Sequence, residues 1–286
     1  MANFKLALSA GHCKHTAGKR CLKSLDANQT REWTLNARIA EKVEKLLADY
    51  TGWELLRVDD RTGEKEVTLT ARTKAANNWG ADLYLAIHHN AGVSGGYGGG
   101  IVGYVYTKPL DESVKWRNEL YHALIATTGL EGNRATPMQK ANLHEVREPR
   151  MPAVLLELGF MDSKTDVPII LSEKYADQCA QAIVKVLVER GNLTRKASGV
   201  ATAPAKPAVK VDAAKSFKRA KAGTYVVNAS DGLNLRTGAS TAKTKIKTLP
   251  NGDTVTCYGY YTGDWLYVKA ADGAVGYCHS GYLKKR

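Results

Sequence analysis

The sequence has few cysteines, and none of them belongs to a recognisable pair motif. There are five in 286 residues, without a CxxC spacing: Cys13, Cys21, Cys179, Cys257 and Cys278. An odd, scattered set argues against a disulfide framework, and the missing CxxC pairs argue against a cysteine-based zinc site. We therefore expect reduced thiols, with no bond between Cys257 and Cys278.

Long hydrophobic runs are missing as well. No segment approaches the roughly 18 uninterrupted apolar residues that a membrane-spanning helix needs. The N-terminal stretch MANFKLALSAGH has one lysine and an apolar run too short for a secretory signal. We expect synthesis in the cytoplasm without a signal peptide and without membrane insertion, so a role outside the cell would need another route of release.

Acidic residues are scarce in the last third of the chain. Residues 1–193 carry 25 Lys and Arg against 23 Asp and Glu, a net charge of +2, whereas residues 194–286 carry 16 against 5, a net charge of +11. So basic a block attracts polyanions such as nucleic acid, anionic lipid or a bacterial wall polymer. Because a recognition helix or base-stacking motif is not visible, we expect no nucleic-acid partner.

Strand-like and helix-like segments alternate over most of the first 190 residues. Strand-like apolar runs occur at 4–8, 53–58, 82–87, 101–106 and 153–158. Apolar residues recur with the spacing of amphipathic helices at 30–50, 67–79, 112–127 and 173–190. This alternation predicts an α/β domain over 1–193, with a mostly parallel sheet flanked by helices.

The character of the sequence changes after Leu193. Residues 194–222 contain two prolines, many alanines and eight basic residues against one acid, and they predict a basic flexible linker. From Thr224 onward, short strand-like runs are separated by Asp-Gly, Asn-Gly and Gly-Asp turn signals. These runs predict a small all-β module over 223–286.

Polar residues follow three of the predicted strands, at the edge where a parallel sheet collects functional groups. His12 follows the first strand, His88 and His89 end the third, and Glu157 lies near the end of the last. Because neighbouring side chains of a strand point to opposite faces, only one of the adjacent histidines can serve a given site. Glu32 lies in the first turn of a helix, where the helix dipole favours an ionised carboxylate. Two imidazoles, one carboxylate and an open position make a catalytic zinc site.

Four segments of the chain resemble the successive motifs of the zinc-dependent N-acetylmuramoyl-L-alanine amidases found in bacterial autolysins and phage endolysins. The resemblance is to the type called amidase family 3. The segments are ALSAGH, EWTLNARIA, LTARTKAANNWGADLYLAIHHNA and MPAVLLELGF, and the resemblance spans nearly all of residues 4–190. It implies one Zn²⁺ per catalytic domain and hydrolysis of the amide between N-acetylmuramic acid and the L-alanine of the peptidoglycan stem peptide.

The resemblance also assigns roles to single residues. The family has Gly-His after the first strand, Glu opening the next helix and Ser-Ile-His-x-Asn-Ala at a strand end, which implies His12, Glu32 and His88 as the zinc ligands. His89 then occupies the variable position. The glutamate of the family's VELGF motif falls on Glu157, which is implied to transfer protons in catalysis.

Two departures from the family pattern leave alternatives open. GHCKHTAG stands in place of Gly-His-Gly-Gly, and the gap between His12 and Glu32 is long. For this reason His15 and Asp26 stay candidates for the zinc site.

Other motifs point away from a different chemistry. HExxH and HxxE zinc motifs are absent, which argues against the common zinc peptidases. His144 precedes the Glu157 strand and is expected to have a structural role. The segment GGYGGG (95–100) has no helix or lysine following at phosphate-binding spacing and is expected to form a flexible rim.

The C-terminal segments LNLRTGAST, LPNGDTV, DWLYVK and GAVGYCHSGYL resemble a bacterial SH3-type domain, a small barrel appended to cell-wall hydrolases. The resemblance implies a wall-binding module over 223–286. Its candidate wall-binding residues are Trp265, Tyr267, Tyr277 and Tyr282, unless they fill the core of the barrel. With the basic linker, this module is expected to bind peptidoglycan and anionic wall polymers.

These observations together predict a two-domain peptidoglycan amidase of phage or prophage origin, released to the cell wall at phage lysis. The alternative is a noncatalytic wall-binding protein with a vestigial metal site. The complete set of His12, Glu32, His88 and Glu157 argues against that alternative.

Overall fold

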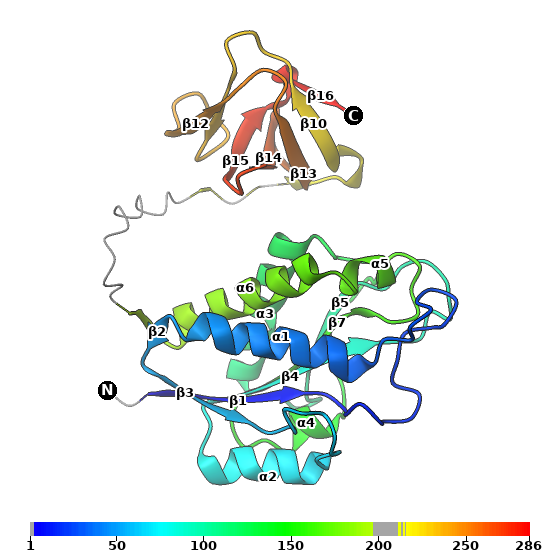
Figure 1. Ribbon diagram of the computed structural model, residues 1–286. Coiled ribbons are helices and arrows are strands. Elements are labelled where there is room, and N and C mark those ends of the chain that lie inside the picture. Colours follow the sequence, from blue (N-terminus) through cyan, green and yellow to red (C-terminus); the bar gives the residue numbers. More distant parts are fainter. Residues whose placement is uncertain (1–2, 197–210, 213, 215) are drawn as a thin grey trace. The chain divides into compact units, whose positions relative to one another are not determined.

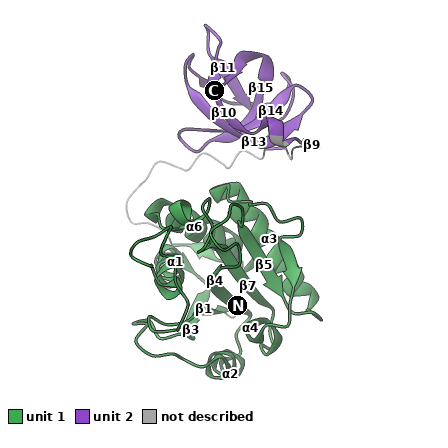
Figure 2. Cartoon of the chain, turned by 90° about the vertical axis from the view of Figure 1, so that its right-hand side faces the viewer, with its two compact units in different colours: residues 1–197 green, residues 198–286 purple. Residues whose placement is uncertain are grey.

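The structure is a computed structural model that describes residues 3–196, 211–212, 214 and 216–286. The chain forms two compact units, residues 1–197 and 198–286 (Figure 2). None of the helices in the described part of the chain is long and apolar enough to cross a membrane. All five cysteines are buried free thiols.

A six-stranded sheet forms the middle of the first unit, with the strand order β3-β1-β4-β7-β5-β6. Its strands are β1 (Phe4–Ala10), β3 (Trp53–Arg57), β4 (Leu83–Asn90), β5 (Ile101–Val105), β6 (Met138–Lys140) and β7 (Ala153–Phe160). The pairs β3-β1, β1-β4 and β4-β7 are parallel, whereas β5 runs antiparallel to β7. The predicted α/β fold with a mostly parallel sheet is confirmed.

Helices cover both faces of this sheet (Figure 1). Three long helices pack together on one face: α1 (Glu32–Leu47), α3 (Asp111–Thr128) and α6 (Glu173–Arg190). Two others lie on the opposite face: α2 (Leu69–Trp79) and α4 (His144–Arg147). The helix α5 (Val167–Ile170) lies against β7.

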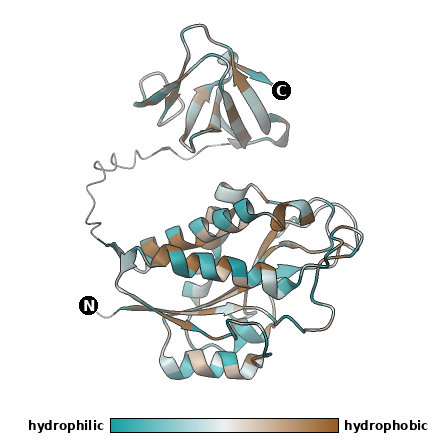
Figure 3. Cartoon of the chain, viewed as in Figure 1, coloured by the Kyte–Doolittle hydropathy of each residue, from teal (hydrophilic) through white to brown (hydrophobic). Residues whose placement is uncertain are grey.

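Alternation along β1 explains why the sheet has two apolar faces. Leu6 and Leu8 belong to the core beneath α1, α3 and α6, whereas Ala7 belongs to a separate core that includes Ala76 of α2 and Val146 of α4. Strands that are buried on both faces carry nearly continuous apolar runs, as in this sheet. Figure 3 shows these runs as brown segments along the strands.

The short elements are the ones that the sequence did not indicate. Neither the three-residue β6 nor the four-residue α4 and α5 is long enough to show a hydrophobic period. A two-stranded pair, β2 (Tyr50–Thr51) with β8 (Thr194–Arg195), is equally short. Its hydrogen bonding ties the residues after α6 to the loop that follows α1.

The second unit is an antiparallel all-β module, as predicted. Its strands are β9 (Ser216–Phe217), β10 (Gly223–Val227), β11 (Leu233–Arg236), β12 (Lys245–Leu249), β13 (Thr254–Thr262), β14 (Trp265–Ala270), β15 (Val275–His279) and β16 (Leu283–Lys285). They surround a core that includes Leu235, Val268 and Cys278. The Asp-Gly, Asn-Gly and Gly-Asp turn signals all fall between strands of this module.

The expected linker over 194–222 lies in large part outside the described residues, and its two ends differ from expectation. At the first end, β8 pairs with β2 of the first unit. At the other end, β9 pairs with β13, and a 3-10 helix, η1 (Arg219–Lys221), also packs on β13. The described residues from Ser216 onward therefore belong to the β module, whose edge strand is too short to be recognised by its pattern.

Candidate active site

The C-terminal edge of the sheet brings the candidate catalytic residues together. His12 follows β1, His88 lies near the end of β4, and Glu157 lies in β7. Within the paired strands, His88 stands in register with Glu157. Glu32 reaches the same edge from the first turn of α1. The topology thus places all four predicted residues at one point of the fold.

Three of these residues form a tight cluster. His12 Nε2 lies 3.3 Å from Glu32 Oε2, and His88 Nδ1 lies 3.1 Å from Glu32 Oε1. One ligand-type atom from each residue lies within 4.8 Å of the others. Glu32 and His88 are buried, whereas His12 is partly exposed. Because His12 stays partly exposed, solvent reaches the cluster from the side of this residue.

The donor set fits a zinc ion. Although burial opposes ionisation, the two histidines hold the pKa of Glu32 well below its usual range, so the carboxylate is charged. Its Oε2 atom is buried and has no hydrogen bond of good geometry to any described residue. Two imidazoles and one carboxylate are the ligands of many catalytic zinc sites. A bound cation would contact the carboxylate oxygen that has no such hydrogen bond.

Local backbone geometry explains the Gly-His pair. A Cβ added to Gly11 would lie 2.0 Å from Cε1 of His88, so only glycine leaves room for that ring. His12 itself has a φ of 68°, in the left-handed region that is uncommon for a residue with a side chain. This turn directs the His12 ring toward Glu32 and produces an edge-to-face contact with the His88 ring, with centroids 5.1 Å apart.

Glu145 is a site residue that sequence reasoning missed. It lies in α4, is 3 % exposed, and its Oε2 lies 3.0 Å from His88 Nε2. Burial opposes a charge on His88, but hydrogen bonds to Glu145 and Glu32 raise its pKa to about 10. Despite its own burial, Glu145 has a pKa lowered to about 2, mainly by the hydrogen bond to His88. In the sequence, Glu145 lies in the HEVRE segment directly after His144, on a helix too short to show a period.

His144 has the structural role that was expected. Its Nε2 lies 3.2 Å from Thr73 Oγ1, so it connects α4 to α2.

The second histidine of the pair, His89, points to the opposite side of β4. Its Nδ1 lies 2.8 Å from Asn36 Oδ1 in α1, and its ring is almost fully buried. Burial lowers its pKa to about 3, so the ring is neutral. His89 is therefore a packing residue, while His88 alone faces the cluster.

Glu157 has the electrostatic properties of a proton-transfer group. Burial raises its pKa to about 7, and its Oε2 has no hydrogen-bond partner among the described residues. A carboxyl group with a pKa near neutrality can both accept and donate a proton. Lys19 lies nearby, with Nζ 3.6 Å from Glu32 Oε2, and its charge opposes the increase in the pKa of Glu157.

The structure places the two alternative ligands away from the cluster. The imidazole of His15 is largely exposed and contacts Glu64 at 3.3 Å. Asp26 accepts hydrogen bonds from the backbone N–H groups of Asn28 and Thr30 and so shapes its own loop. Neither residue belongs to the described group of metal-type ligands, which consists of His12, Glu32 and His88.

The loop 92–100, which contains the glycine-rich segment 95–100, is hydrogen-bonded to residues that follow β7. Asp162 Oδ2 accepts hydrogen bonds from the backbone N–H groups of Gly92, Val93 and Ser94. Gly100 N–H donates to Asp166 at 2.7 Å. These carboxylates are distant in sequence from the loop, and the expected flexibility of the rim stays a prediction.

The β module carries a groove of about 680 Å³. Trp265 and Tyr282 line it, together with His279 and the loop before β11. The Trp265 and His279 rings meet edge to face with centroids 5.3 Å apart, and Tyr282 is 51 % exposed. Two of the four predicted aromatic residues therefore lie at a surface that a ligand can reach.

The other two predicted aromatics are placed differently. Tyr277 is fully buried, and its hydroxyl donates to the Asp212 carbonyl at 3.2 Å, so its prediction as a wall-contacting residue is wrong. Tyr267 is half-buried against it, with ring centroids 5.3 Å apart. The Tyr277 ring therefore covers one side of Tyr267.

An α/β sheet that gathers two imidazoles, a buried carboxylate and a neutral-range glutamate at its C-terminal edge has the features of a hydrolytic metal centre. Comparison with known proteins agrees with this class. Residues 6–189 match the N-acetylmuramoyl-L-alanine amidase family, and residues 231–284 match the bacterial SH3 domain. The chain belongs to the N-acetylmuramoyl-L-alanine amidase family.

Several relatives support this assignment. The chain is 30 % identical over 196 residues to the amidase CwlM of Bacillus licheniformis, covering 68 % of this chain and 72 % of the relative. It is 27 % identical over 194 residues to an endolysin of Bacillus phage SPP1, covering 68 % of each. An amidase structure from Clostridium difficile 630 superposes with a TM-score of 0.60 at 26 % identity, covering 67 % of this chain and 98 % of that one.

Proposed function

We propose that the chain is a zinc-dependent hydrolase of the amide between the lactyl group of N-acetylmuramic acid and the L-alanine of the stem peptide. The observation that carries the proposal is the cluster of His12, Glu32 and His88, whose donor atoms lie within 4.8 Å of one another, together with Glu157, which stands in register with His88. Peptidoglycan amidase activity is the activity of the family to which the chain belongs.

In this proposal each residue has a distinct task. His12, Glu32 and His88 hold the zinc ion, which when bound polarises the scissile carbonyl and lowers the pKa of a water molecule. Glu157 accepts the proton of the attacking water and passes it to the leaving amine of L-alanine. A pKa of about 7 suits both transfers, since the group is neither fully protonated nor fully ionised near neutral pH.

Product analysis tests the reaction. Purified walls treated with the protein should release stem peptides with a new N-terminal L-alanine and should gain no reducing sugar ends. Chelation should abolish the release, and added zinc should restore it. Wall binding without release of amines would instead identify the noncatalytic alternative, and new reducing ends would identify a glycosidase.

We further propose that the β module and the basic residues of 194–222 anchor the enzyme to peptidoglycan and anionic wall polymers. The match to a bacterial SH3 domain and the net charge of +11 over 194–286 support this anchoring role. The groove lined by Trp265 and Tyr282 adds aromatic contacts to this electrostatic attraction.

The similarity to the endolysin of Bacillus phage SPP1 supports a role at phage lysis. In this proposal the protein is made in the host cytoplasm and reaches the wall when the membrane is permeabilised. Expression in a bacterial host tests it: the protein should fractionate with a cytoplasmic marker, and the cells should lyse only after a membrane-permeabilising agent is added. Release into the medium before permeabilisation would contradict this role.

A further inference from the structure

We propose that Arg72 is a positioning residue that holds both candidate histidine ligands in place, one through the backbone and the other through Ser9 and Glu145. The inference rests on the proposed zinc site. It assigns a role in metal affinity to a side chain that touches neither the ion nor the substrate.

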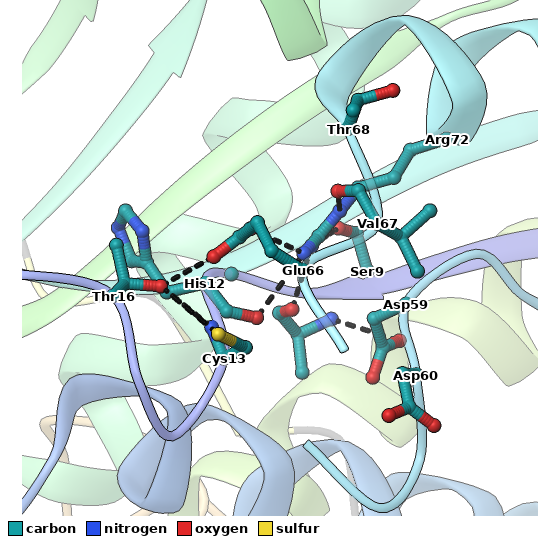
Figure 4. A network of polar contacts seen from close by, with 12 residues as sticks. Ser9, His12, Cys13, Thr16, Asp59, Asp60, Glu66, Val67, Thr68 and Arg72 are labelled. Carbon is teal, nitrogen blue, oxygen red and sulfur yellow. Dashed lines mark hydrogen bonds and ion pairs between the residues drawn. The ribbon is translucent and has the colours of Figure 1, made fainter. Parts of the chain in front are cut away.

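Arg72 lies in the first turns of α2 and is 1 % exposed. Its guanidinium group donates to Ser9 Oγ at 3.0 Å, to the Ala10 carbonyl at 2.7 Å and to the His12 carbonyl at 3.1 Å. Figure 4 shows the side chain reaching from α2 to the end of β1. A buried cation with three partners at the end of β1 and just after it is fixed in orientation, and it fixes this part of the backbone in return.

The backbone branch acts on His12. The carbonyls of Ala10 and His12 flank Gly11, and Arg72 binds both of them. His12 has a left-handed backbone at a φ of 68°, a conformation that needs support from its surroundings. Hydrogen bonds to the two carbonyls supply this support, so Arg72 holds the turn that directs the His12 ring toward the cluster.

Glu66 extends this branch to the loop after His12. Its Oε1 lies 3.4 Å from Arg72 Nη2, and its Oε2 accepts a hydrogen bond from Thr16 Oγ1. Thr16 Oγ1 in turn accepts from the Cys13 N–H at 3.0 Å. Both flanks of His12 are therefore tied to the same guanidinium group (Figure 4).

The side-chain branch acts on His88. Ser9 Oγ, which accepts from Arg72, donates to Glu145 Oε1 at 2.7 Å, and Tyr84 donates to the same oxygen at 2.7 Å. The other oxygen, Oε2, lies 3.0 Å from His88 Nε2. With Nε2 committed to Glu145, the Nδ1 atom of His88 faces Glu32. In many metal sites a carboxylate orients a metal-binding histidine in this way, by a hydrogen bond to the ring nitrogen that does not bind the metal.

The planar fork of arginine is what allows one side chain to serve both branches. Two of its nitrogens reach three oxygens on β1 and the following loop, while Nε donates to the Val67 carbonyl at 2.9 Å. A lysine would keep the charge in this position but could not span the same acceptors. Arg72→Lys therefore separates the positioning role from the charge.

The test measures zinc affinity directly, by competition with a chromophoric chelator. We expect Arg72→Lys and Glu145→Gln each to weaken zinc binding roughly 10- to 100-fold, the range found when residues that hydrogen-bond to metal ligands are replaced. Ser9→Ala should weaken it less. The effects of Arg72→Lys and Ser9→Ala should be less than additive, because both lie on the path to Glu145. Arg117→Lys is the matched control, since Arg117 is a buried arginine on α3.

The Co²⁺-substituted proteins provide a second readout, because the visible absorption of cobalt reports ligand geometry. Arg72→Lys should change this spectrum, and Arg117→Lys should leave it as in the wild type. A folded Arg72→Lys protein with wild-type zinc affinity and cobalt spectrum would overturn the proposal. If Arg72→Lys does not fold, the test rests on Ser9→Ala and Glu145→Gln. Wild-type zinc affinity in both of these variants would overturn the proposal. A wild-type protein that does not bind zinc would instead refute the proposed function.

Discussion

His88 and His89 are neighbours in β4 but face different partners: His88 Nδ1 lies 3.1 Å from Glu32 Oε1, and His89 Nδ1 lies 2.8 Å from Asn36 Oδ1. The two positions form a natural matched pair. His88→Ala should lose both zinc binding and wall hydrolysis, because it removes a ligand. His89→Ala should keep zinc and lower stability, because it removes a buried ring. Metal analysis and thermal unfolding of both variants check this, and equal zinc content would contradict the assignment.

Zinc uptake should release a proton from His88. Hydrogen bonds to Glu145 and Glu32, acting against burial, raise the pKa of His88 from 6.5 to about 10 in the zinc-free protein. The ring is then protonated at pH 8, and a metal can bind only after that proton leaves. Titration calorimetry in two buffers of different ionisation enthalpy measures the release, and the apparent zinc affinity should rise with pH below 10. Affinity that is independent of pH between 7 and 9 would contradict this state of His88.

Glu157→Gln should keep zinc and lose turnover by roughly two orders of magnitude or more, since general acid–base groups contribute about that much. Chelator competition and the release of new N-terminal alanine measure the two properties separately. Turnover near that of the wild type would exclude Glu157 as the proton-transfer group.

The same substitution should change the pH dependence of stability in zinc-free protein. The pKa of Glu157 is raised from 4.5 to about 7, so the unfolded chain ionises first as the pH rises. The carboxyl group therefore lowers the free energy of unfolding progressively between pH 4.5 and 7, by up to about 3 kcal/mol. Between pH 4.5 and 7 the free energy of unfolding of Glu157→Gln should therefore rise relative to that of the wild type. Denaturant unfolding at several pH values measures this difference. A difference in unfolding free energy that does not change with pH would mean that Glu157 has an ordinary pKa.

Binding of the protein to cell walls should have one contribution that weakens as the salt concentration rises and another that does not. Replacing the lysines of 194–222 by glutamine should weaken wall binding at low salt and matter little at high salt, because exposed charges are screened over about 8 Å at physiological ionic strength. Trp265→Ala should weaken binding several-fold at every salt concentration, as expected for an aromatic contact in a groove. Tyr260→Ala, at an exposed tyrosine of β13 that does not line the groove, is the control. Co-sedimentation with purified walls measures all three, and unchanged binding throughout would refute the anchoring role.

Sequence reasoning succeeded where a pattern is long or an ordered motif is present. The periodic segments became α1, α2, α3 and α6, and the polar residues at strand ends met at one edge because parallel strands share that edge. It missed Glu145, which lies on a helix of four residues and reaches His88 only through the fold. Tyr277 was wrongly predicted as a wall-contacting residue for a similar reason, because the residue whose carbonyl accepts its hydroxyl, Asp212, is 65 positions away. Contacts between distant short elements leave no period in a sequence.

The close approach of Gly11 to the His88 ring gives a practical way to sort relatives of this chain. A methyl group at position 11 would overlap the imidazole, with only 2.0 Å between the added carbon and Cε1, and the ring would have to rotate away from Glu32. A homologue that keeps both histidines and both glutamates but has alanine or a larger residue at this point cannot present the same cluster. Genome surveys that count only the polar residues would score such a chain as an active enzyme, whereas inspecting this one small position would mark it as inactive.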